Sequence, residues 1–300
     1  MTNILVTGSY GQLGTEIKLL SDRYPQYNFM FTDVDSLDIT DRLSVAEFVT
    51  GNDVRYILNC AAYTAVDKAE TDRRKCETVN AVAVRLLAKV ARDAGCGMLH
   101  ISTDYVFDGH TCHPYTEEST PRPLSVYGMT KRKGEKVLLH MYPEAIVLRT
   151  SWLYSPYGSN FVKTMRKLGR ERKELSVVYD QVGTPTYARD LAKAVLTVMH
   201  RTMKPGHGLG GLYHYSDEGV CSWYDFARKI HELSGIKGCK ITPILSDQYP
   251  TVAKRPTYSV LDKSKFKRTF GLEIPHWEDS LKHCVRELTR AESAGADEGE

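Results

Sequence analysis

Residues 4–14 read ILVTGSYGQLG, and this stretch decides how the rest of the chain is interpreted. It begins with a short apolar run of strand length and continues with three glycines, Gly8, Gly11 and Gly14. From Leu13 to Leu20, apolar residues recur at the i, i+4, i+7 spacing of a helix, which must end before Pro25. The opening therefore predicts a buried strand, a tight glycine turn and a helix.

The same alternation continues through the first half of the chain. Apolar runs of strand length lie at 27–32, 56–61, 98–102 and 145–149. Helical patterns separate them, the clearest at 82–94, where Gly95 is a typical helix terminator. Strands that alternate with helices predict an α/β fold, in which a doubly wound, Rossmann-type parallel sheet is covered on both faces.

After about residue 150 the strand and helix signals become less regular. We expect a loop at 204–211, a helix capped by Ser222 and closed by Gly235, and an amphipathic helix at 277–288. The tail from about residue 291 lacks apolar anchors and is expected to be frayed.

These patterns predict two domains. Residues 1–150 form the dinucleotide-binding domain, to which segments from about 174–203 return, and residues 151–300 form mainly a smaller α/β domain that binds the substrate.

Composition excludes several functional classes. The 300 residues are 42% hydrophobic and 26% charged, and a net charge of +3 favours neither nucleic acid nor a membrane surface as partner. The seven cysteines form no C-x-x-C pair, which indicates reduced thiols and a cytoplasmic location. No basic, apolar leader precedes Ile4 and no apolar run is long enough to span a bilayer, so we expect neither a signal peptide nor a membrane anchor.

The glycine turn is suited to a dinucleotide. Glycines let the backbone approach a pyrophosphate, which then lies at the positive end of the following helix. Asp33 falls 19 residues after Gly14, at the end of the second predicted strand, where a carboxylate can accept hydrogen bonds from ribose hydroxyls. This carboxylate repels a 2′-phosphate and so favours NADH. Asp38 and Ile39 either contact the adenine or form a solvated turn before a helix.

A tyrosine and a lysine stand four residues apart in SVYGMTKRKGE (125–135). Of the 18 tyrosines, only Tyr127 has a lysine, Lys131, four positions later. On a helix capped by Ser125 the two side chains share a face, so we expect the ammonium to lower the pKa of the phenol and make it a usable acid. Thr103 ends the fourth predicted strand, where it can bind a substrate carbonyl oxygen.

Eight stretches, in this order, resemble the extended short-chain dehydrogenases and, more closely, the dTDP-4-dehydrorhamnose reductase family. They are GSYGQLG (8–14), NCAAYTAVDKAE (59–70), STDYVFDG (102–109), VYGMTKRKGE (126–135), RTSWLY (149–154), DQVGTPTYARDLA (180–192), SDEGVCSWYDFA (216–227) and RPTYSVLDKSKF (255–266). The resemblance covers nearly the whole chain. It implies reduction of the 4-keto group of dTDP-4-dehydro-L-rhamnose with NADPH or NADH.

The resemblance also implies a role for individual residues. The residues implied to bind the cofactor are Gly8, Gly11, Gln12, Leu13, Gly14, Asp33, Asp38, Ile39, Ala62, Tyr63, Thr64, Ile101, Tyr127 and Lys131. The implied catalytic residues are Thr103, Tyr127 and Lys131. The substrate is expected to meet Thr103, Asp104 and Trp152, and its nucleotide diphosphate to meet Arg255. The family's Mg²⁺, bound at a dimer contact, would correspond here to Glu16 and Asp190, but a glutamate is usual at the second position. We therefore assign no metal site, and both Mg²⁺ binding and a homodimer remain open expectations.

Two alternatives stay open. A sugar-nucleotide 4,6-dehydratase or epimerase shares this superfamily, but resembling dehydratases carry Asp-Glu after the threonine, whereas here Tyr105 follows Asp104. A non-catalytic subunit is the other alternative, because a regulatory subunit of methionine adenosyltransferase resembles the same reductases. The intact set of Thr103, Tyr127 and Lys131 favours an enzyme.

Overall fold

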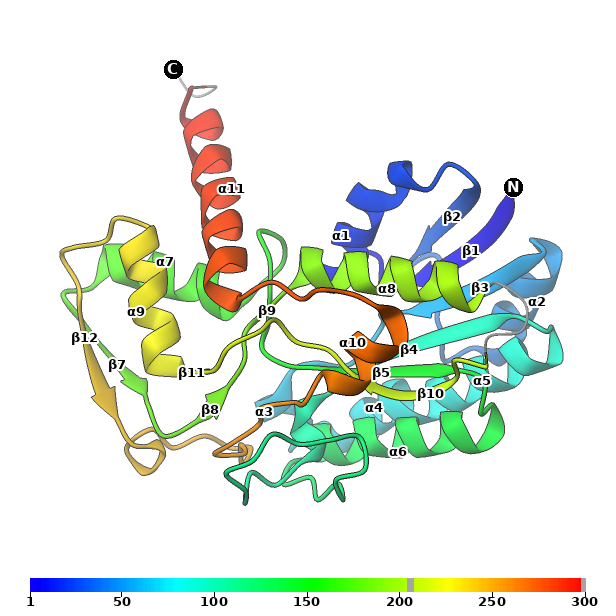
Figure 1. Cartoon of the computed structure of the whole chain (residues 1–300), viewed down its shortest axis with the longest axis horizontal. Coiled ribbons are helices and arrows are strands. Elements are labelled where there is room, and N and C mark those ends of the chain that lie inside the picture. Colours follow the sequence, from blue (N-terminus) through cyan, green and yellow to red (C-terminus); the bar gives the residue numbers. More distant parts are fainter. Residues whose placement is uncertain (204–207, 298–300) are drawn as a thin grey trace.

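A computed structural model of the chain describes residues 1–203 and 208–297, which form a six-stranded sheet with flanking helices and a smaller lobe (Figure 1). The sheet has the order β10-β5-β4-β3-β1-β2, and all its neighbouring strands are parallel. Its strands are β1 (Thr2–Thr7), β2 (Tyr27–Thr32), β3 (Val54–Asn59), β4 (Gly97–Thr103), β5 (Ile146–Thr150) and β10 (Gly211–His214). The predicted α/β fold with a doubly wound parallel sheet is confirmed.

Helices cover both faces of the sheet, because alternate side chains of each strand point to opposite sides. Ile4 and Val6 of β1 join one core cluster, and Leu5 joins the other. The first cluster includes residues of α1 (Gln12–Leu20), α8 (Ala188–Thr202) and α10 (Ser264–Phe270). The second includes residues of α2 (Arg42–Gly51), α5 (Ala83–Asp93) and α6 (Val126–Met141).

The smaller lobe, on the left of Figure 1, has its own apolar cluster. Its main elements are α7 (Phe161–Glu171), β7 (Glu174–Val178), α9 (Trp223–Leu233), β12 (Lys240–Ile244) and α11 (Trp277–Asp297). Strand β7 pairs with β12 rather than with the large sheet, and β10 supplies the sheet's last strand. The chain therefore returns to the sheet through α8 and β10.

Short elements complete the fold. They are η1 (Ser21–Arg23), α3 (Val66–Ala69), α4 (Arg73–Glu77), the π-helix η2 (Thr78–Val82), η3 (Asp104–Val106), β6 (Leu153–Tyr154), β8 (Val182–Gly183), β9 (Thr186–Tyr187), β11 (Cys221–Ser222) and η4 (Ser246–Gln248). Within the described part of the chain, no helix has the length and apolar character needed to cross a membrane.

The carboxyl-terminal helix differs from the expectation. Helix α11 continues to Asp297 instead of fraying from about residue 291. The reason is a tertiary contact, since Glu292 accepts hydrogen bonds from Arg166 and Arg170 of α7. The last part of the expected tail, 298–300, and residues 204–207 of the expected loop lie outside the described residues.

The start of α6 is fixed from two sides. The Ser125 hydroxyl caps the helix by accepting from the Gly128 N–H at 3.2 Å, as predicted. Glu70, just after α3, accepts from the Val126 N–H at 2.8 Å. A Cβ on Gly128 would lie 2.2 Å from the Tyr105 carbonyl oxygen, so only glycine allows this close approach. The first turn of α6, which carries Tyr127, is thereby held against the ends of β4 and α3.

A buried ion pair joins the middle of α6 to the sheet. Both carboxylate oxygens of Glu135 accept from the Arg149 guanidinium at 2.8 Å, and neither side chain is exposed. The Ser102 hydroxyl donates to the same carboxylate at 2.6 Å. One carboxylate thus connects α6, β4 and β5.

We expect Glu135→Gln to lower the free energy of unfolding by about 3–5 kcal/mol, because it leaves the Arg149 charge buried without its counter-ion. Urea unfolding measures this change. The control is Glu77→Gln, which breaks a solvent-exposed pair with Lys133 and should cost about 0–1 kcal/mol. Equal effects of the two substitutions would contradict the role of the buried pair.

Candidate active site

One cavity of about 920 Å³ lies along the carboxyl ends of the parallel strands. It collects residues from the ends of β1 to β5 and from the first turns of α1 and α6, together with Trp152 and Trp223. Every residue predicted to bind cofactor or substrate lines it, with the exception of Arg255. The structure therefore brings together residues that lie far apart in the sequence.

The glycine loop forms a cradle that side chains would fill. Gly8 has φ +67°, and a Cβ there would lie 2.6 Å from the Ala61 amide nitrogen. A Cβ on Gly14 would lie 2.4 Å from the Gly8 carbonyl oxygen. The helix that follows begins after Gly11 without a side-chain cap, which leaves N–H groups free to bind phosphate. The loop thus fits the diphosphate of a dinucleotide.

Asp33 lies directly after β2 and keeps acceptor capacity. Its carboxylate accepts from the N–H groups of Tyr10 and Val34, each at 2.9 Å. A carboxylate offers about four acceptor sites, so it can still bind ribose hydroxyls. Asp38 is exposed and accepts from the Thr40 N–H at 2.8 Å, whereas Ile39 is buried in the core.

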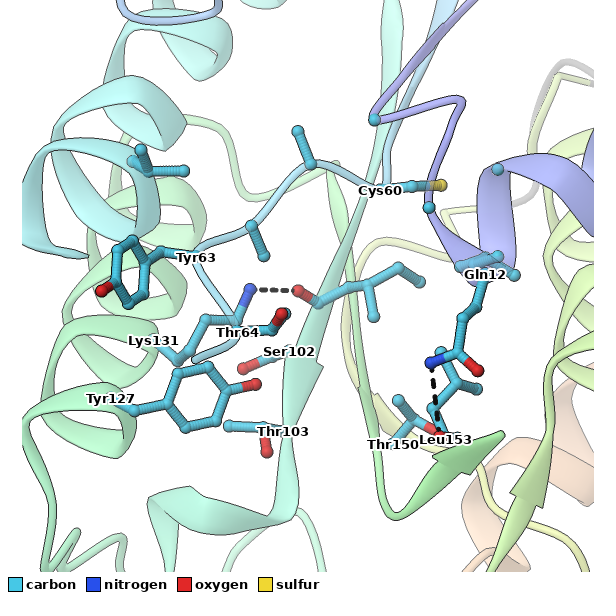
Figure 2. Close-up of a pocket in the computed structure, with 18 of the residues that line it drawn as sticks. Gln12, Cys60, Tyr63, Thr64, Ser102, Thr103, Tyr127, Lys131, Thr150 and Leu153 are labelled. Carbon is cyan, nitrogen blue, oxygen red and sulfur yellow. Dashed lines mark hydrogen bonds between the residues drawn. The ribbon is translucent and has the colours of Figure 1, made fainter. Parts of the chain in front are cut away.

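Gln12 connects the glycine loop to the segment after β5. Its amide nitrogen donates to the Leu153 carbonyl at 3.5 Å (Figure 2), and its oxygen accepts from Asn160 at 3.0 Å. Leu13 is buried beneath the loop. On the opposite wall, after β3, lie Ala62, Tyr63 and Thr64. The Tyr63 N–H is held by the Asn80 side chain at 2.9 Å, which fixes this wall.

Tyr127, Lys131 and Thr103 lie together at one end of the cavity (Figure 2). Lys131 Nζ donates to the Ile101 carbonyl at 2.6 Å and lies 3.4 Å from Nε2 of His100. Burial lowers the pKa of Lys131 to about 8, although the Glu135 charge opposes the change. The helix therefore brings the lysine to the site, but its amine is directed towards β4.

The expected lowering of the tyrosine pKa is wrong for this structure. Burial raises the pKa of Tyr127 above its ordinary value, and a hydrogen bond with Thr103 only opposes the rise. The nearby Asp104 charge raises the pKa further. The physical reason is that the lysine amine binds the Ile101 carbonyl, while most of the tyrosine side chain is buried. Tyr127 is consequently a neutral phenol that holds the proton an acid must donate.

Asp104 is a buried carboxylate with one unsatisfied oxygen. Oδ1 accepts from the Thr103 hydroxyl at 3.0 Å, whereas Oδ2 has no hydrogen-bond partner among the described residues. Burial raises the pKa of Asp104 to about 6, although the hydrogen bond from Thr103 opposes the rise. Because the side chain lines the cavity, its free oxygen can bind a hydroxyl group there.

Trp152 forms part of the wall in an unusual backbone conformation. Its φ is +44°, one of two positive values among the described non-glycine residues, and such strain often accompanies a functional site. The indole ring stacks on Trp223 of α9 with centroids 3.5 Å apart. A Cβ on Gly183 would lie 2.7 Å from this ring. The lobe thus presents a fixed aromatic surface to the cavity.

Arg255 lies beside the cavity. Its guanidinium donates to both oxygens of Asp67, at 3.1 and 2.6 Å, and it also interacts with the Tyr105 side chain. Tyr105 does line the cavity, and its ring packs edge-on against Tyr127 with centroids 5.7 Å apart. Arg255 therefore does not line the cavity itself, but it contacts Tyr105, which does.

A model described as the RmlD substrate binding domain matches residues 1–290. The chain belongs to this family. A dTDP-4-dehydrorhamnose reductase of Aggregatibacter actinomycetemcomitans is 40% identical over 289 residues, which cover 94% of this chain and 98% of the relative. The crystal structure of a dTDP-4-dehydrorhamnose reductase from Clostridium acetobutylicum ATCC 824 matches with a TM-score of 0.91 and 42% identity, covering 96% of this chain and 100% of that one. A Bacillus anthracis reductase of the same name, solved in complex with NADP, matches with a TM-score of 0.90 and 37% identity over the same shares.

The acidic residues considered for Mg²⁺ pair with other side chains of this RmlD family member. The buried Glu16 carboxylate accepts from Arg189 at 2.8 Å. Asp190 accepts from Lys193 at 2.8 Å and from Ser280 at 2.7 Å. The described residues contain no group of three or more His, Cys, Asp or Glu side chains placed to hold a metal ion. Arginine and lysine already supply the positive charge at these positions.

Sequence reasoning missed several residues that contact the predicted RmlD-family site. His100 lies next to Lys131, Asp67 binds Arg255, Trp223 stacks on Trp152, and Cys60 lines the cavity. Asp67, Cys60 and Trp223 belong to stretches that resemble the family, which is a signal that could have marked them. For His100, the available signal was its place in the fourth strand, three residues before Thr103.

We expect Asp104→Asn to stabilise the fold at neutral pH. The pKa of Asp104 is about 6 when folded, above its ordinary value of 3.8, so the folded chain binds the proton more tightly. The wild type therefore loses stability as the pH rises from about 4 to about 6, which the asparagine variant avoids. At pH 7.5 the variant should gain roughly 1–3 kcal/mol in urea unfolding.

That gain should shrink steadily towards pH 4. The control is Asp53→Asn, which removes the charge of an exposed side chain and should change the free energy of unfolding by about 0.5 kcal/mol or less. A gain that is equal at pH 4 and pH 7.5 would contradict the raised pKa.

Proposed function

We propose that the chain reduces the 4-keto group of dTDP-4-dehydro-L-rhamnose, with NADPH or NADH, to dTDP-L-rhamnose. The observation that carries this proposal is one continuous cavity, with a diphosphate cradle and Asp33 at one end and Tyr127, Lys131 and Thr103 at the other. A site for a dinucleotide is thus continuous with a site for acid catalysis. The named activity of the similar RmlD-family proteins supports the choice of substrate.

The cradle residues would bind the dinucleotide by its diphosphate and ribose. When bound, the reduced nicotinamide supplies the hydride. Asp33 disfavours a 2′-phosphate by its charge, yet two backbone N–H groups already donate to it and moderate that charge. The similar reductase in complex with NADP supports use of the phosphorylated cofactor as well. Both reduced cofactors therefore belong to the proposal.

Tyr127 would be the general acid. A ketone that accepts a hydride becomes an alkoxide, which needs a proton and hydrogen-bond donors as its charge develops. The neutral phenol of Tyr127 gives that proton, and the Thr103 hydroxyl donates to the same oxygen. The phenolate that remains is stabilised when Lys131 is cationic. Asp104 and Trp152 would position the sugar through a hydroxyl and an apolar ring face.

A dehydratase is the less favoured candidate. Elimination needs a base in addition to the acid, and the resembling dehydratases carry a glutamate where this chain has Tyr105. Here the Tyr105 ring packs on Tyr127 and contacts Arg255. Tyr105 therefore packs against the proposed acid, Tyr127, and does not supply a base that could remove a proton. A purely regulatory role is less favoured because the complete acid-catalytic set lines the cavity.

Cofactor absorbance tests the proposal directly. The purified chain should oxidise NADPH or NADH when dTDP-4-dehydrorhamnose is added, and more slowly with other ketosugar nucleotides. Tyr127→Phe should retain cofactor affinity and lose roughly 10²–10⁴-fold in kcat, the usual contribution of a general acid.

The control is Tyr249→Phe, which alters an exposed tyrosine and should leave kcat unchanged. Wild-type turnover by Tyr127→Phe would remove this phenol as the proton donor. Cofactor binding without oxidation on any of the ketosugar nucleotides would favour the regulatory role.

We further propose that Arg255 binds the nucleotide diphosphate. The guanidinium presents its fork to the Asp67 carboxylate, an anion of similar geometry to a phosphate. Arg255→Gln should raise KM for the sugar nucleotide about tenfold or more, since charge-assisted hydrogen bonds contribute about 1.5–3 kcal/mol. Initial-rate kinetics measures this KM. The control is Arg228→Gln, which removes an exposed arginine of α9. An unchanged KM would place the diphosphate elsewhere.

Three broader features remain proposals. We propose a division into a dinucleotide-binding part and a substrate-binding lobe, supported by their separate apolar clusters. A cytoplasmic location rests on the pattern of seven cysteines, and the composition supports a partner that is neither nucleic acid nor membrane. A homodimer rests on family resemblance alone, and light scattering would reveal a particle of twice the chain mass.

A further inference from the structure

A chain of buried polar groups leads from β1 to Lys131 behind the cavity. Thr7 Oγ1 lies 2.8 Å from Asn59 Oδ1, Asn59 Nδ2 lies 2.9 Å from His100 Nδ1, and His100 Nε2 lies 3.4 Å from Lys131 Nζ. These four side chains come from β1, β3, β4 and α6, and each is at most 1% exposed. Polar groups are costly to bury unless each is hydrogen-bonded, so such a chain requires an explanation.

His100 is the member that touches the amine. Burial lowers the pKa of His100 well below its ordinary value, and the charge of Lys131 lowers it further. The ring is therefore neutral, with one nitrogen that donates and one that accepts. If Nε2 accepts from a lysine ammonium, Nδ1 carries the proton and must donate to an oxygen of Asn59.

The amide of Asn59 can pair with His100 whether the imidazole proton is on Nδ1 or on Nε2. As placed, the Thr7 hydroxyl donates to Asn59 Oδ1 and the amide nitrogen faces His100. This orientation puts the imidazole proton on Nε2, where only an uncharged lysine amine can accept it. A half-turn of the amide reverses every donor and acceptor, and His100 then accepts from the ammonium. Since the charged form gains the stronger, charge-assisted hydrogen bond, the chain favours the ammonium overall.

We propose that His100, held by Asn59, is a positioning residue that fixes Lys131 Nζ and stabilises its cationic form inside the protein. This inference rests on the proposed function, in which a cationic Lys131 stabilises the phenolate left on Tyr127. The carbonyl oxygen of the next residue in β4, Ile101, accepts a hydrogen bond from the same amine at 2.6 Å. Two successive residues of this strand therefore define where the amine lies.

Other groups also act on this amine. The titratable groups that face Lys131 are Glu135 and Tyr127 on its own helix, His100 on β4, Cys60 after β3 and Cys76 on α4. Burial lowers the pKa of Lys131, and the charge of Glu135 opposes the change. His100 differs from the other groups because its nitrogen lies within hydrogen-bond distance of the amine.

The test replaces His100 with Phe, which keeps a ring but removes both nitrogens. Lys131 is observed directly by a pH titration of its side-chain NMR signal in lysine-labelled full-length protein, assigned with the Lys131→Met variant. We expect the midpoint to fall by about one pH unit or more, since the ammonium loses its acceptor. The basic limb of the kcat/KM profile should move in the same direction, with about a fivefold loss at pH 8.

A matched control and a rescue variant accompany this test. His231→Phe removes another buried imidazole, which contacts the Met165 carbonyl in the smaller lobe, and should leave the Lys131 midpoint unchanged. His100→Gln restores an acceptor and should recover part of the shift. Should His100→Phe not fold, His100→Asn serves instead, because its shorter amide does not reach Nζ.

The outcomes separate this inference from the proposed function. A Lys131 midpoint that stays within about 0.3 pH units in a folded His100 variant overturns the inference. Full turnover by Lys131→Met would instead remove the lysine from the catalytic mechanism. A shifted midpoint would then still establish the contact between His100 and Lys131.

Discussion

The site depends on one buried ion pair, between Glu135 and Arg149. The Glu135 carboxylate binds β4 and β5 and belongs to the helix that carries Tyr127 and Lys131, so it sets the distance between that helix and these two strands. His214 of β10 lies 3.2 Å from the same guanidinium, and the Phe107 ring lies 5.0 Å from it. Because burying two charges is costly unless their geometry is well satisfied, the helix has little freedom to slide. Thr103, which follows Ser102, is thereby held at a constant distance from Tyr127.

Burial governs the acid chemistry more than the neighbouring lysine does. It raises the pKa of both Tyr127 and Asp104, and it lowers the pKa of Lys131. Each shift favours an uncharged side chain, as expected for groups removed from water. An acid that acts on a developing alkoxide benefits from this environment, because its proton is retained until a stronger base arises beside it. The lysine then matters chiefly for the product of that transfer, the phenolate.

Local patterns in the sequence were sufficient for the fold and for most of the cavity wall. The glycine turn, the position of Asp33 after a strand and the Ser125 cap are short-range signals, and each element formed where expected. Contacts between segments that are distant in the sequence could not be predicted from such patterns. The direction of the Lys131 amine depends on a carbonyl of β4, the pairing of Arg255 depends on Asp67, and the length of α11 depends on two arginines of α7. Such contacts follow from how elements pack, which spacing along the chain does not specify.

The stacked tryptophans make the cavity visible to spectroscopy. Of the three tryptophans in the chain, Trp152 and Trp223 line the cavity, and Trp277 lies buried against Phe226. Two of the three indoles that contribute to intrinsic emission therefore share one environment. A nucleotide that enters the cavity changes the polarity around both at once and offers its base or nicotinamide as a quencher. Binding of a nucleotide in the cavity can therefore be followed without a label, through the fluorescence of Trp152 and Trp223.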